Sequence, residues 1–554
     1  MNGFALNRGQ VGTGFRHRLA AAIRTAGPSE NGALTIFALI LFVLMTMMGG
    51  LAVDLMKYEQ TRTALQNTLD RSTLAAASLT QGLDPETVVR DYFDAAGMSG
   101  SLTNVVVTEG INFRNVQADA SADTRPSFLH MLGITELDAP GTATAEQRIG
   151  NVEIVLVLDV SGSMGGDKLA NLKTAATEFI DTLLGDDTED RFSVAIVPYN
   201  AQVNLGATLR SKYNAVHLNN RTDLNCLELP SSVYNTAGVS RTLALPMVAY
   251  ADVVSSTDTS NNSYVDETST SSSKGATMDT NDLHCKTTAA NVVRLPSNNV
   301  ATLKSQINAL VAGGNTSITL GMKWGLSLIE PGARDMFDSL IDQGAIAESF
   351  RGRPYDWTDD EAMKVIVVMT DGEHVAHDKV NDAYKTGTAP IWRSTGDGNY
   401  SMYYAAHSGS SDYWVPHKGS WYSAPWNSGS GVTQLDWREV WQRQRLTWVA
   451  YQLYGRGQVG STNRSTAYSN AMTQFRSQYE SVSTMNANLQ KSCTLAKDNG
   501  VIVYGIAFEA ETNGQTQISK CASSAAHYFD AEGLEIQSAF RTIASNISQL
   551  RLTQ

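Results

Sequence analysis

The apolar positions of this chain begin with one long uninterrupted run near the N-terminus. From Asn31 to Val53 there is no charged residue, and most positions hold Ala, Leu, Ile, Phe, Val or Met. About 20 such residues in a helix cross a hydrocarbon core of roughly 30 Å. A cleaved signal peptide is the alternative, but its apolar region covers only about 7–15 residues. The run therefore predicts an uncleaved transmembrane helix over residues 31–53.

The charges on either side of this run predict its orientation. Four arginines precede it, with only Glu30 to offset them, whereas the charges that follow Val53 nearly cancel. The arginines are Arg8, Arg16, Arg18 and Arg24. Because basic residues flank the cytoplasmic end of a span, we expect residues 1–30 in the cytoplasm and everything after about Asp54 outside.

The segment after the span predicts a second, smaller unit. Apolar residues recur on one helical stripe from Asp54 to about Thr80. Weaker patterns follow from Pro85 to about Arg148. They predict a helix capped by Asp84 that ends near Ala96, a strand at 104–107, a short helix at 126–132 and a final strand at 141–145. Residues 54–150 are therefore expected to form an extracytoplasmic helix and a small α+β unit.

From residue 151 to residue 554, short apolar runs alternate with amphipathic segments. Val152–Leu158 is almost continuously apolar, as a strand buried on both faces would be, and Asp167–Leu184 has one apolar helical face. Further strands are predicted at 192–197, 365–369 and 501–508, with further helices at 317–329 and 534–550. Strands that alternate with helices predict an α/β fold with a doubly wound parallel sheet.

Two long segments interrupt this alternation and are interpreted as insertions. Residues 204–295 are rich in Ser, Thr, Asn and Asp, with a low-complexity centre at 255–282, and we expect a weakly ordered loop there. Residues 376–460 hold seven of the nine tryptophans of the chain. These aromatic residues either form a binding surface for sugar or protein, or pack together to hold the insertion in place.

Composition narrows the functional classes. The chain has 554 residues, a formal net charge of −13 and a pI near 5.2. A nucleic-acid-binding protein needs a basic footprint on its surface, and this balance argues against one.

The four cysteines form two pairs that are local in the sequence. Cys226 lies near Cys285, Cys493 lies near Cys521, and no C-x-x-C motif suggests structural zinc. Outside the cytoplasm such pairs form disulfides, and we predict Cys226–Cys285 and Cys493–Cys521. We expect the first bridge to matter less to the fold, because the segment that it encloses has little core of its own.

Three segments far apart in the chain carry the candidate chemistry. Asp159, Ser161 and Ser163 follow the first apolar strand, Thr316 follows a glycine turn, and Asp371 follows another apolar strand. Because parallel strands end at one edge of a sheet, we expect these residues to lie together at a solvent-facing edge. Carboxylate and hydroxyl oxygens suit Mg²⁺, and an incomplete ligand shell leaves a position for a partner's carboxylate. A turn with a helix cap and no metal is the alternative.

A hydrolase is not supported by these residues. A nucleophile elbow needs G-x-S-x-G, and neither Ser161 nor Ser163 has the first glycine. His374 and His377 follow Asp371 closely, but a histidine pair on a loop more often faces solvent than serves as a base or ligand. We therefore expect a binding protein and not an enzyme.

The D-x-S-x-S motif, with a distant Thr and a distant Asp, resembles the metal-ion-dependent adhesion site (MIDAS) of von Willebrand factor A domains. By that resemblance Ser161, Ser163 and Thr316 would supply hydroxyl ligands, while Asp159 and Asp371 would bind directly or through water. Asn315 or Ser317 could take the place of Thr316. The ion would be Mg²⁺ or another divalent cation such as Mn²⁺ or Ca²⁺.

The N-terminal part resembles a second family. Residues 31–39, followed by Gly50-Leu51-Ala52-Val53-Asp54, are similar to the TadE/TadG-like membrane segment of Flp (tight adherence) pilus assembly. Such a segment before a von Willebrand A domain is the TadG-like arrangement. It implies a single-pass protein of the bacterial inner membrane, largely periplasmic, that binds other pilus-assembly components through an acidic residue. The alternative is a surface-exposed or pilus-associated adhesin that binds host or matrix ligands.

Overall fold

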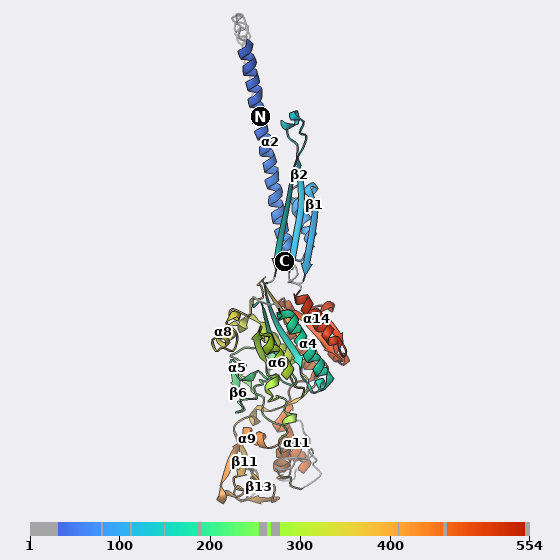
Figure 1. Cartoon of the computed structure of the whole chain (residues 1–554). Coiled ribbons are helices and arrows are strands. Elements are labelled where there is room, and N and C mark those ends of the chain that lie inside the picture. Colours follow the sequence, from blue (N-terminus) through green and yellow to red (C-terminus); the bar gives the residue numbers. More distant parts are fainter. Residues whose placement is uncertain are drawn as a thin grey trace, which may run out of the picture. The chain divides into compact units, whose positions relative to one another are not determined.

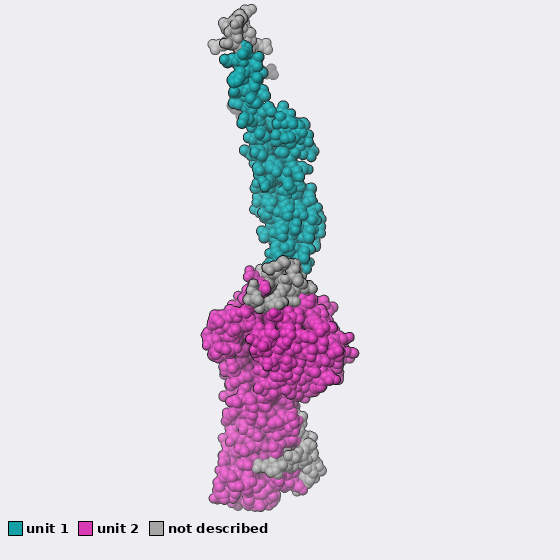
Figure 2. All heavy atoms as spheres, in the orientation of Figure 1, with its two compact units in different colours: residues 1–109, 114–147 teal, residues 110–113, 148–554 magenta. Residues whose placement is uncertain are grey.

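The chain divides into two compact units. The computed structural model describes residues 32–78, 81–110, 113–148, 150–185, 190–253, 263–266, 277–359, 361–407, 409–457 and 463–548. One unit holds residues 1–109 and 114–147, and the other holds residues 110–113 and 148–554 (Figure 2). The predicted cytoplasmic tail, residues 1–30, lies outside the described residues.

The first unit is built on one long helix. Helix α2, Gly32–Ala77, runs for 46 residues and joins the predicted span to the predicted extracytoplasmic helix without a break (Figure 1). Its first half is long and apolar enough to cross a membrane, and its side chains there are mostly exposed. Its second half buries Leu65, Leu69 and Ala76 against the rest of the unit.

A helix and a three-stranded sheet complete this first unit. Helix α3, Pro85–Ala95, begins where the Asp84 carboxylate accepts a hydrogen bond from the backbone N–H of Thr87 at 2.9 Å, as the predicted cap requires. The strands are β1, Leu102–Gly110, β2, Phe113–Thr124, and β3, Leu137–Arg148, in the order β1-β2-β3. Strand β2 was not predicted from the sequence. A short 3-10 helix, η2, Leu129–Leu132, lies in the turn between β2 and β3.

The second unit contains a six-stranded sheet in the order β18-β17-β9-β4-β5-β8. Its strands are β4, Asn151–Asp159, β5, Phe192–Tyr199, β8, Arg294–Ser297, β9, Ala362–Thr370, β17, Ile502–Phe508, and β18, Tyr528–Ala531. All neighbours pair in parallel except β8, an antiparallel strand at the edge beside β5. Counted along the chain the order is 3-2-1-4-5-6, the doubly wound arrangement, so the predicted fold class is confirmed.

Helices cover both faces of this sheet, and alternate strand residues face each set. Ile154 and Leu156 point to one core, whereas Val155 and Val157 point to the other. The first face is covered by α4, Asp167–Leu184, α6, Val300–Ala309, and α14, Glu535–Ser548. The second is covered by α7, Ile318–Ile329, α8, Arg334–Asp342, α12, Val482–Asp498, and α13, Thr512–Cys521.

Helix α7 lies directly on the central strands. All of its residues are buried. A Cβ added at Gly321 would lie 2.5 Å from the Tyr199 ring, and one at Gly325 would lie 2.6 Å from Val157. Any larger residue would push the helix outward, so the two glycines fix the height of α7 and of the segment that precedes it.

The described part of the first insertion is packed, which corrects the expectation of a weakly ordered loop for that part. Its described part contains α5, Gly206–Arg210, β6, Ala215–Val216, and β7, Leu245–Pro246. Buried Leu209, Leu227 and Tyr234 join the core under α7. These apolar residues are spaced irregularly among polar ones, so no periodicity revealed them. Residues 254–262 and 267–276, which include most of the low-complexity centre, lie outside the described residues.

The second insertion forms a small domain-like layer around its aromatic residues. Five of its strands form a sheet in the order β14-β13-β12-β11-β15. Trp414, Trp437, Trp441 and Trp448 are buried in its core. Most of the tryptophans therefore pack together to hold the insertion in place, which was the second of the two interpretations. The layer continues past the expected end of the insertion at residue 460, because Met472 and Phe475 belong to the same core. Its elements are β10, Asp378–Val380, β11, Thr388–Ser394, β12, Tyr400–Tyr403, β13, Tyr413–Val415, β14, Ser420–Tyr422, β15, Val432–Asp436, α9, Trp437–Arg443, α10, Leu446–Trp448, η11, Val449–Gly455, α11, Arg464–Phe475, and β16, Arg476–Gln478.

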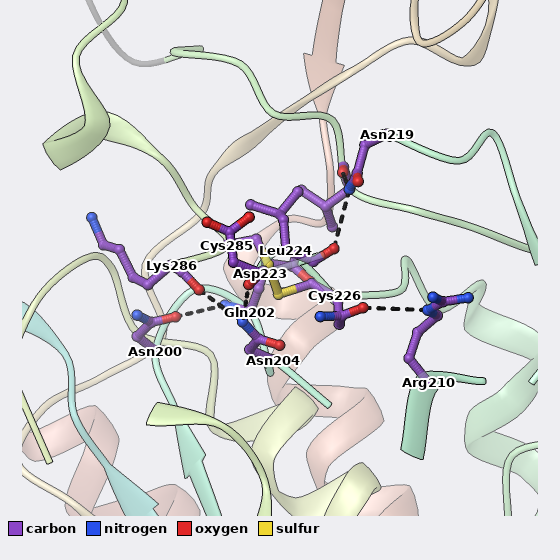
Figure 3. Close-up of a disulfide and its surroundings, with 12 residues drawn as sticks. Asn200, Gln202, Asn204, Arg210, Asn219, Asp223, Leu224, Cys226, Cys285 and Lys286 are labelled. Atoms are coloured by element: carbon purple, nitrogen blue, oxygen red, sulfur yellow. Dashed lines mark hydrogen bonds between the residues drawn. A yellow bond between two sulfur atoms is a disulfide. The ribbon is translucent and has the colours of Figure 1, made fainter. Parts of the chain in front are cut away.

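Both predicted disulfides are present. Cys226 pairs with Cys285, and Cys493 pairs with Cys521. Around the first bridge, the Asn204 side chain donates to the carbonyls of Asp223 at 3.0 Å and Lys286 at 2.9 Å (Figure 3). The segment that the bridge encloses places Leu229, Tyr234 and Leu245 in the core, which contradicts the expectation that it has little core of its own.

Replacing Cys226 and Cys285 together by Ala should lower the stability of the second unit markedly. The two residues are 59 apart, and in the chain-entropy model such a loop contributes about 4 kcal/mol, slightly more than the 28-residue separation of Cys493 and Cys521. Urea denaturation of the oxidised double variant and of wild type would measure the difference. An unchanged midpoint would show that the bridge adds nothing to the packed insertion.

Candidate functional site

Two carboxylates lie at the point where the strand order of the sheet reverses. Asp159 is the last residue of β4, and Asp371 immediately follows β9. These strands are adjacent and parallel, yet their connections leave in opposite directions across the sheet. The carboxyl ends of strands at such a switch point form the usual ligand crevice of doubly wound sheets.

Backbone hydrogen bonds bring the third predicted segment to the same place. The N–H of Gly162 donates to the Gly314 carbonyl at 2.8 Å, and the N–H of Gly313 donates to the Val160 carbonyl at 2.9 Å. The Thr316 carbonyl accepts from the N–H of Val375 at 2.9 Å. The loop before α7 is thus tied both to the loop after β4 and to the loop after β9.

The side chains form one hydrogen-bonded group. Ser163 Oγ donates to Asp371 Oδ1 at 2.8 Å, Ser161 Oγ lies 3.5 Å from the same atom, and the two serine oxygens are 3.0 Å apart. Asp159 accepts from the Ser161 N–H at 2.8 Å and from Thr370 Oγ1 at 2.8 Å. The structure therefore brings together four of the five predicted residues: Ser161, Ser163 and Asp371 through their side chains, and Asp159 through the Ser161 N–H.

The fifth residue, Thr316, joins the group through its backbone and is itself buried. Ser317, the first alternative, is also buried, and its N–H donates to the Asn200 carbonyl at 2.8 Å as α7 begins. Asn315, the second alternative, is half-buried.

The carboxylates are buried, which corrects the expectation of a solvent-facing edge. Asp159 is fully buried and Asp371 nearly so, whereas Ser163 and Gly162 are exposed. The loop after β4 folds back onto Gly314 and covers the strand ends. The site therefore has its carboxylates at the base and a serine hydroxyl at its rim.

This arrangement concentrates negative charge where little water can screen it. Burial raises the pKa of Asp159 to about 6, and the nearby charge of Asp371 adds to the increase. Lys168 offsets part of this charge, since its Nζ lies 3.2 Å from Asp371 Oδ2 and 3.5 Å from Glu509 Oε2. Sequence analysis missed Lys168, although a lysine in the first turn of the helix after D-x-S-x-S was there to be noticed.

The serine hydroxyls are not used as helix caps. Asp159 does make a turn with the Ser161 N–H, as the metal-free alternative requires. However, Ser161 makes no capping bond to the short helix that follows it, and the cap position of α4 is Gly166. The hydroxyls instead point to each other and to Asp371, so the local fold arranges oxygen atoms around one point.

The donor set fits a hard divalent cation. Among the described residues there is no cluster of three or more His, Cys, Asp or Glu side chains that could hold a metal. A cation bound at this group would need neutral oxygen ligands as well, and the group offers two carboxylates beside the hydroxyls of Ser161 and Ser163. Such ligands suit Mg²⁺, Mn²⁺ or Ca²⁺ better than softer metals.

His374 and His377 are buried, so the expectation that they face solvent is wrong. His374 Nε2 lies 3.2 Å from Thr319 Oγ1, and His377 Nε2 lies 2.9 Å from the Gln202 side-chain nitrogen. After Asp371 the chain turns inward between α7 and the first insertion. The two rings therefore bond Thr319 and Gln202 rather than the site serines.

Comparison with protein families supports both predicted resemblances. Residues 32–79 match the model of the putative Flp pilus-assembly TadE/G-like family, and residues 153–224 match the von Willebrand factor type A domain. The chain thus carries a TadE/G-like segment followed by a von Willebrand A domain, as predicted. No curated protein gives a significant match to the sequence.

Several solved structures resemble this chain at low identity. The vWF domain of the type V pili tip protein Mfa5 from Porphyromonas gingivalis is 13% identical, with 73% of this chain and 98% of that domain covered and a TM-score of 0.29. The adhesive tip pilin GBS104 from Group B Streptococcus agalactiae is 14% identical, with 72% and 100% covered and a TM-score of 0.29.

The pilus adhesin SpaC from Lactobacillus rhamnosus GG is 10% identical, with 80% of this chain covered and a TM-score of 0.30. The match spans about a third of the length of SpaC, 33%. The fold assignment rests on the strand order and the family model, and not on these overlays.

The buried histidines predict a loss of stability in acid. Burial lowers the pKa of His374 to about 3 and that of His377 to about 4, whereas an unfolded histidine titrates near 6.5. Between these values the unfolded chain binds more protons, so the free energy of unfolding falls as the pH falls. Each histidine should lower the free energy of unfolding by about 2 kcal/mol between pH 7 and pH 5.

Replacing His377 by Phe should remove its share of this dependence. Urea denaturation of wild type and variant at both pH values measures the free energy of unfolding. If the two proteins lost the same stability between pH 7 and pH 5, His377 would not be a buried neutral group.

Proposed function

We propose that this chain is a membrane-anchored, metal-dependent protein-binding component of Flp (tight adherence) pilus assembly. The observation that carries the proposal is the meeting of two buried carboxylates, Asp159 and Asp371, at the switch point, where Asp371 accepts from the Ser163 hydroxyl and Asp159 accepts from the Ser161 N–H. The matching TadE/G-like segment and von Willebrand A domain support the pilus context.

Five residues would hold the ion in a MIDAS-type site, with hydroxyls from Ser161, Ser163 and Thr316 and carboxylates from Asp159 and Asp371. A bound Mg²⁺, or Mn²⁺ or Ca²⁺ in its place, supplies a Lewis-acidic position for a carboxylate oxygen. The protein itself buries the two carboxylates and holds both serines against Asp371. It also leaves Ser163 exposed, on the side from which a partner's acidic residue approaches. No catalytic step is needed for this role.

The membrane part of the proposal rests on α2 and on the disulfides. The first half of this helix is long and apolar enough for a single-pass anchor. The arginines before it favour a cytoplasmic N-terminus in the bacterial inner membrane. Two disulfides fit an oxidising compartment such as the periplasm for the bulk of the chain.

An adhesin released to the surface or to the pilus is the second candidate. One observation favours it: Trp392, Tyr403 and Tyr413 form a cluster of ring contacts at 5.3–6.4 Å, and Tyr403 is exposed. Exposed aromatic side chains are common at sugar- and protein-binding surfaces. Fractionation separates the two candidates, because an assembly component stays with the inner membrane and an adhesin is found on pili or shed.

Replacing either site carboxylate should abolish divalent-cation binding. Asn is a better replacement than Ala, because Asp159 and Asp371 are buried acceptors and their donors need a partner. Calorimetric titration of Mg²⁺ into the purified full-length protein should give heat of binding for wild type and none for Asp159→Asn or Asp371→Asn. Asp335→Asn, at an exposed carboxylate of α8, is the matched control.

Co-purification from pilus-producing cells, with Mg²⁺ or with EDTA, extends this test to the partner. Wild type and Asp335→Asn should retain partners only with Mg²⁺, and the two site variants should lose them under both conditions. Circular dichroism checks that every variant is folded. Partner binding by wild type that persists unchanged in EDTA would overturn the metal-dependent mechanism.

Replacing Lys168 by Met should strengthen Mg²⁺ binding. The ammonium group lies beside Asp371 and repels an incoming cation while it neutralises the carboxylate. Removing this charge should raise the affinity on the order of tenfold, or about 1.4 kcal/mol, at low salt. Lys168→Arg keeps the charge and should leave the affinity near that of wild type. Equal affinities for Lys168→Met and Lys168→Arg would show that the lysine does not compete with the ion.

A further inference from the structure

The turn between β2 and β3 presents a group of exposed apolar side chains. We call residues 127–134 the β2–β3 tip. Met131 is 80% exposed and Leu132 is 61% exposed, and Phe128 and Ile134 are exposed as well. Large apolar side chains that gather on one short loop usually meet a partner or a membrane. The core of this unit lies elsewhere, between α2, α3 and the sheet.

The tip is fastened to one place on α2. The buried carboxylate of Asp54 accepts three backbone hydrogen bonds, from Ser127 at 2.8 Å, Phe128 at 2.7 Å and Leu129 at 2.8 Å. Three such bonds, together with Lys57 nearby, hold the pKa of Asp54 below its ordinary value although burial acts in the opposite direction. The tip therefore lies beside the helix (Figure 1), and these three hydrogen bonds hold it there.

The contact of the Phe128 ring shows where along α2 the tip lies. It packs against the bare backbone of α2 at Gly50, where an added Cβ would overlap the ring. Gly50 lies one helical turn before Asp54, which is the first charged residue after Glu30. The tip thus contacts the helix on the membrane side of its first charge.

The length of α2 allows the position of the tip to be compared with the thickness of a membrane. From Gly32 to Gly50 the helix rises about 27 Å, at about 1.5 Å per residue, and the hydrocarbon core is roughly 30 Å thick. If residues 31–53 span the bilayer, Gly50 lies near the outer boundary of the acyl chains. A loop packed against Gly50 then lies in the membrane interface and not in bulk water.

We propose that the β2–β3 tip inserts into the non-cytoplasmic leaflet of the membrane, with Met131 and Leu132 among the acyl chains. This inference rests on the membrane anchoring in the proposed function. Lys57 and Arg125 fit the same placement. Both are exposed, the Lys57 ammonium lies 3.4 Å from the Arg125 carbonyl, and Lys57 lies just beyond Asp54 on the outer side, at the level of lipid phosphates.

Fluorescence quenching by labelled lipids tests the insertion in the full-length protein. All four native cysteines are paired, so one added cysteine gives a single labelling site. Leu132→Cys probes the tip, and Val43→Cys, exposed within the span, reports anchoring. Leu83→Cys is the matched control, since Leu83 is 65% exposed in the same unit but beyond the far end of α2. Each variant carries an environment-sensitive fluorophore in phosphatidylethanolamine–phosphatidylglycerol vesicles with nitroxide on the acyl chains.

The outcomes separate the tip from the anchor. We expect blue-shifted, lipid-quenched emission at positions 43 and 132 and unquenched emission at position 83. If the fluorophore at position 43 is quenched but the one at position 132 emits like the one at position 83, the tip does not insert. That result overturns the proposal and is still consistent with the membrane anchor. A blue shift at 132 without lipid quenching would mean that a protein covers the tip, and it also overturns the proposal. Absence of quenching at 43 would refute the membrane anchor itself.

Discussion

The structure of the second unit depends on how the carboxyl ends of the adjacent strands β4 and β9 accommodate two buried carboxylates. Asp159 and Asp371 extend from neighbouring strand ends into a space with little water, and their mutual repulsion is greater there than at a surface. Hydrogen-bond donors and one cation surround this negative charge. They are two serine hydroxyls, the Thr370 hydroxyl, a backbone N–H and the Lys168 ammonium. The two serines lie in the loop after β4, Thr370 ends β9, and Lys168 lies in the first turn of α4, so all of these groups come from elements that meet at the switch point. A cation is the natural complement to such a group, because no single lysine neutralises both carboxylates.

The core and the site are coupled through α7. Gly321 and Gly325 let this helix rest on Tyr199 and Val157, and the segment that precedes it closes over the loop after β4 through the Gly162–Gly314 hydrogen bond. Tyr199 in turn donates to the Met369 carbonyl at 2.9 Å, two residues before Asp371. A small change in the height of α7 would therefore shift the oxygen atoms of the site, although no residue of α7 itself supplies one of them.

Much of this arrangement could be predicted from the sequence, because it is encoded locally. An apolar strand before D-x-S-x-S and an amphipathic helix after it gave β4 and α4, and the boundaries of α4 agree with those expected. The remainder depends on contacts between distant residues. Asp159 contacts Thr370 from another strand, His374 contacts Thr319 of α7, and His377 contacts His284 of the first insertion. Leu209 and Tyr234 likewise join a core with residues of α7. The two residues of each such contact lie far apart in the sequence, so a local pattern cannot reveal the contact.

The continuity of α2 has a mechanical consequence. A single helix of 46 residues runs from the apolar segment into the core of the first unit, where Leu65 and Leu69 are packed beneath the sheet. The described part of this helix contains no proline, and unbroken helical hydrogen bonding makes it stiff in torsion as well as in bending. A rotation of the apolar segment about its own axis would therefore be passed along the helix to the three-stranded sheet that packs on its second half.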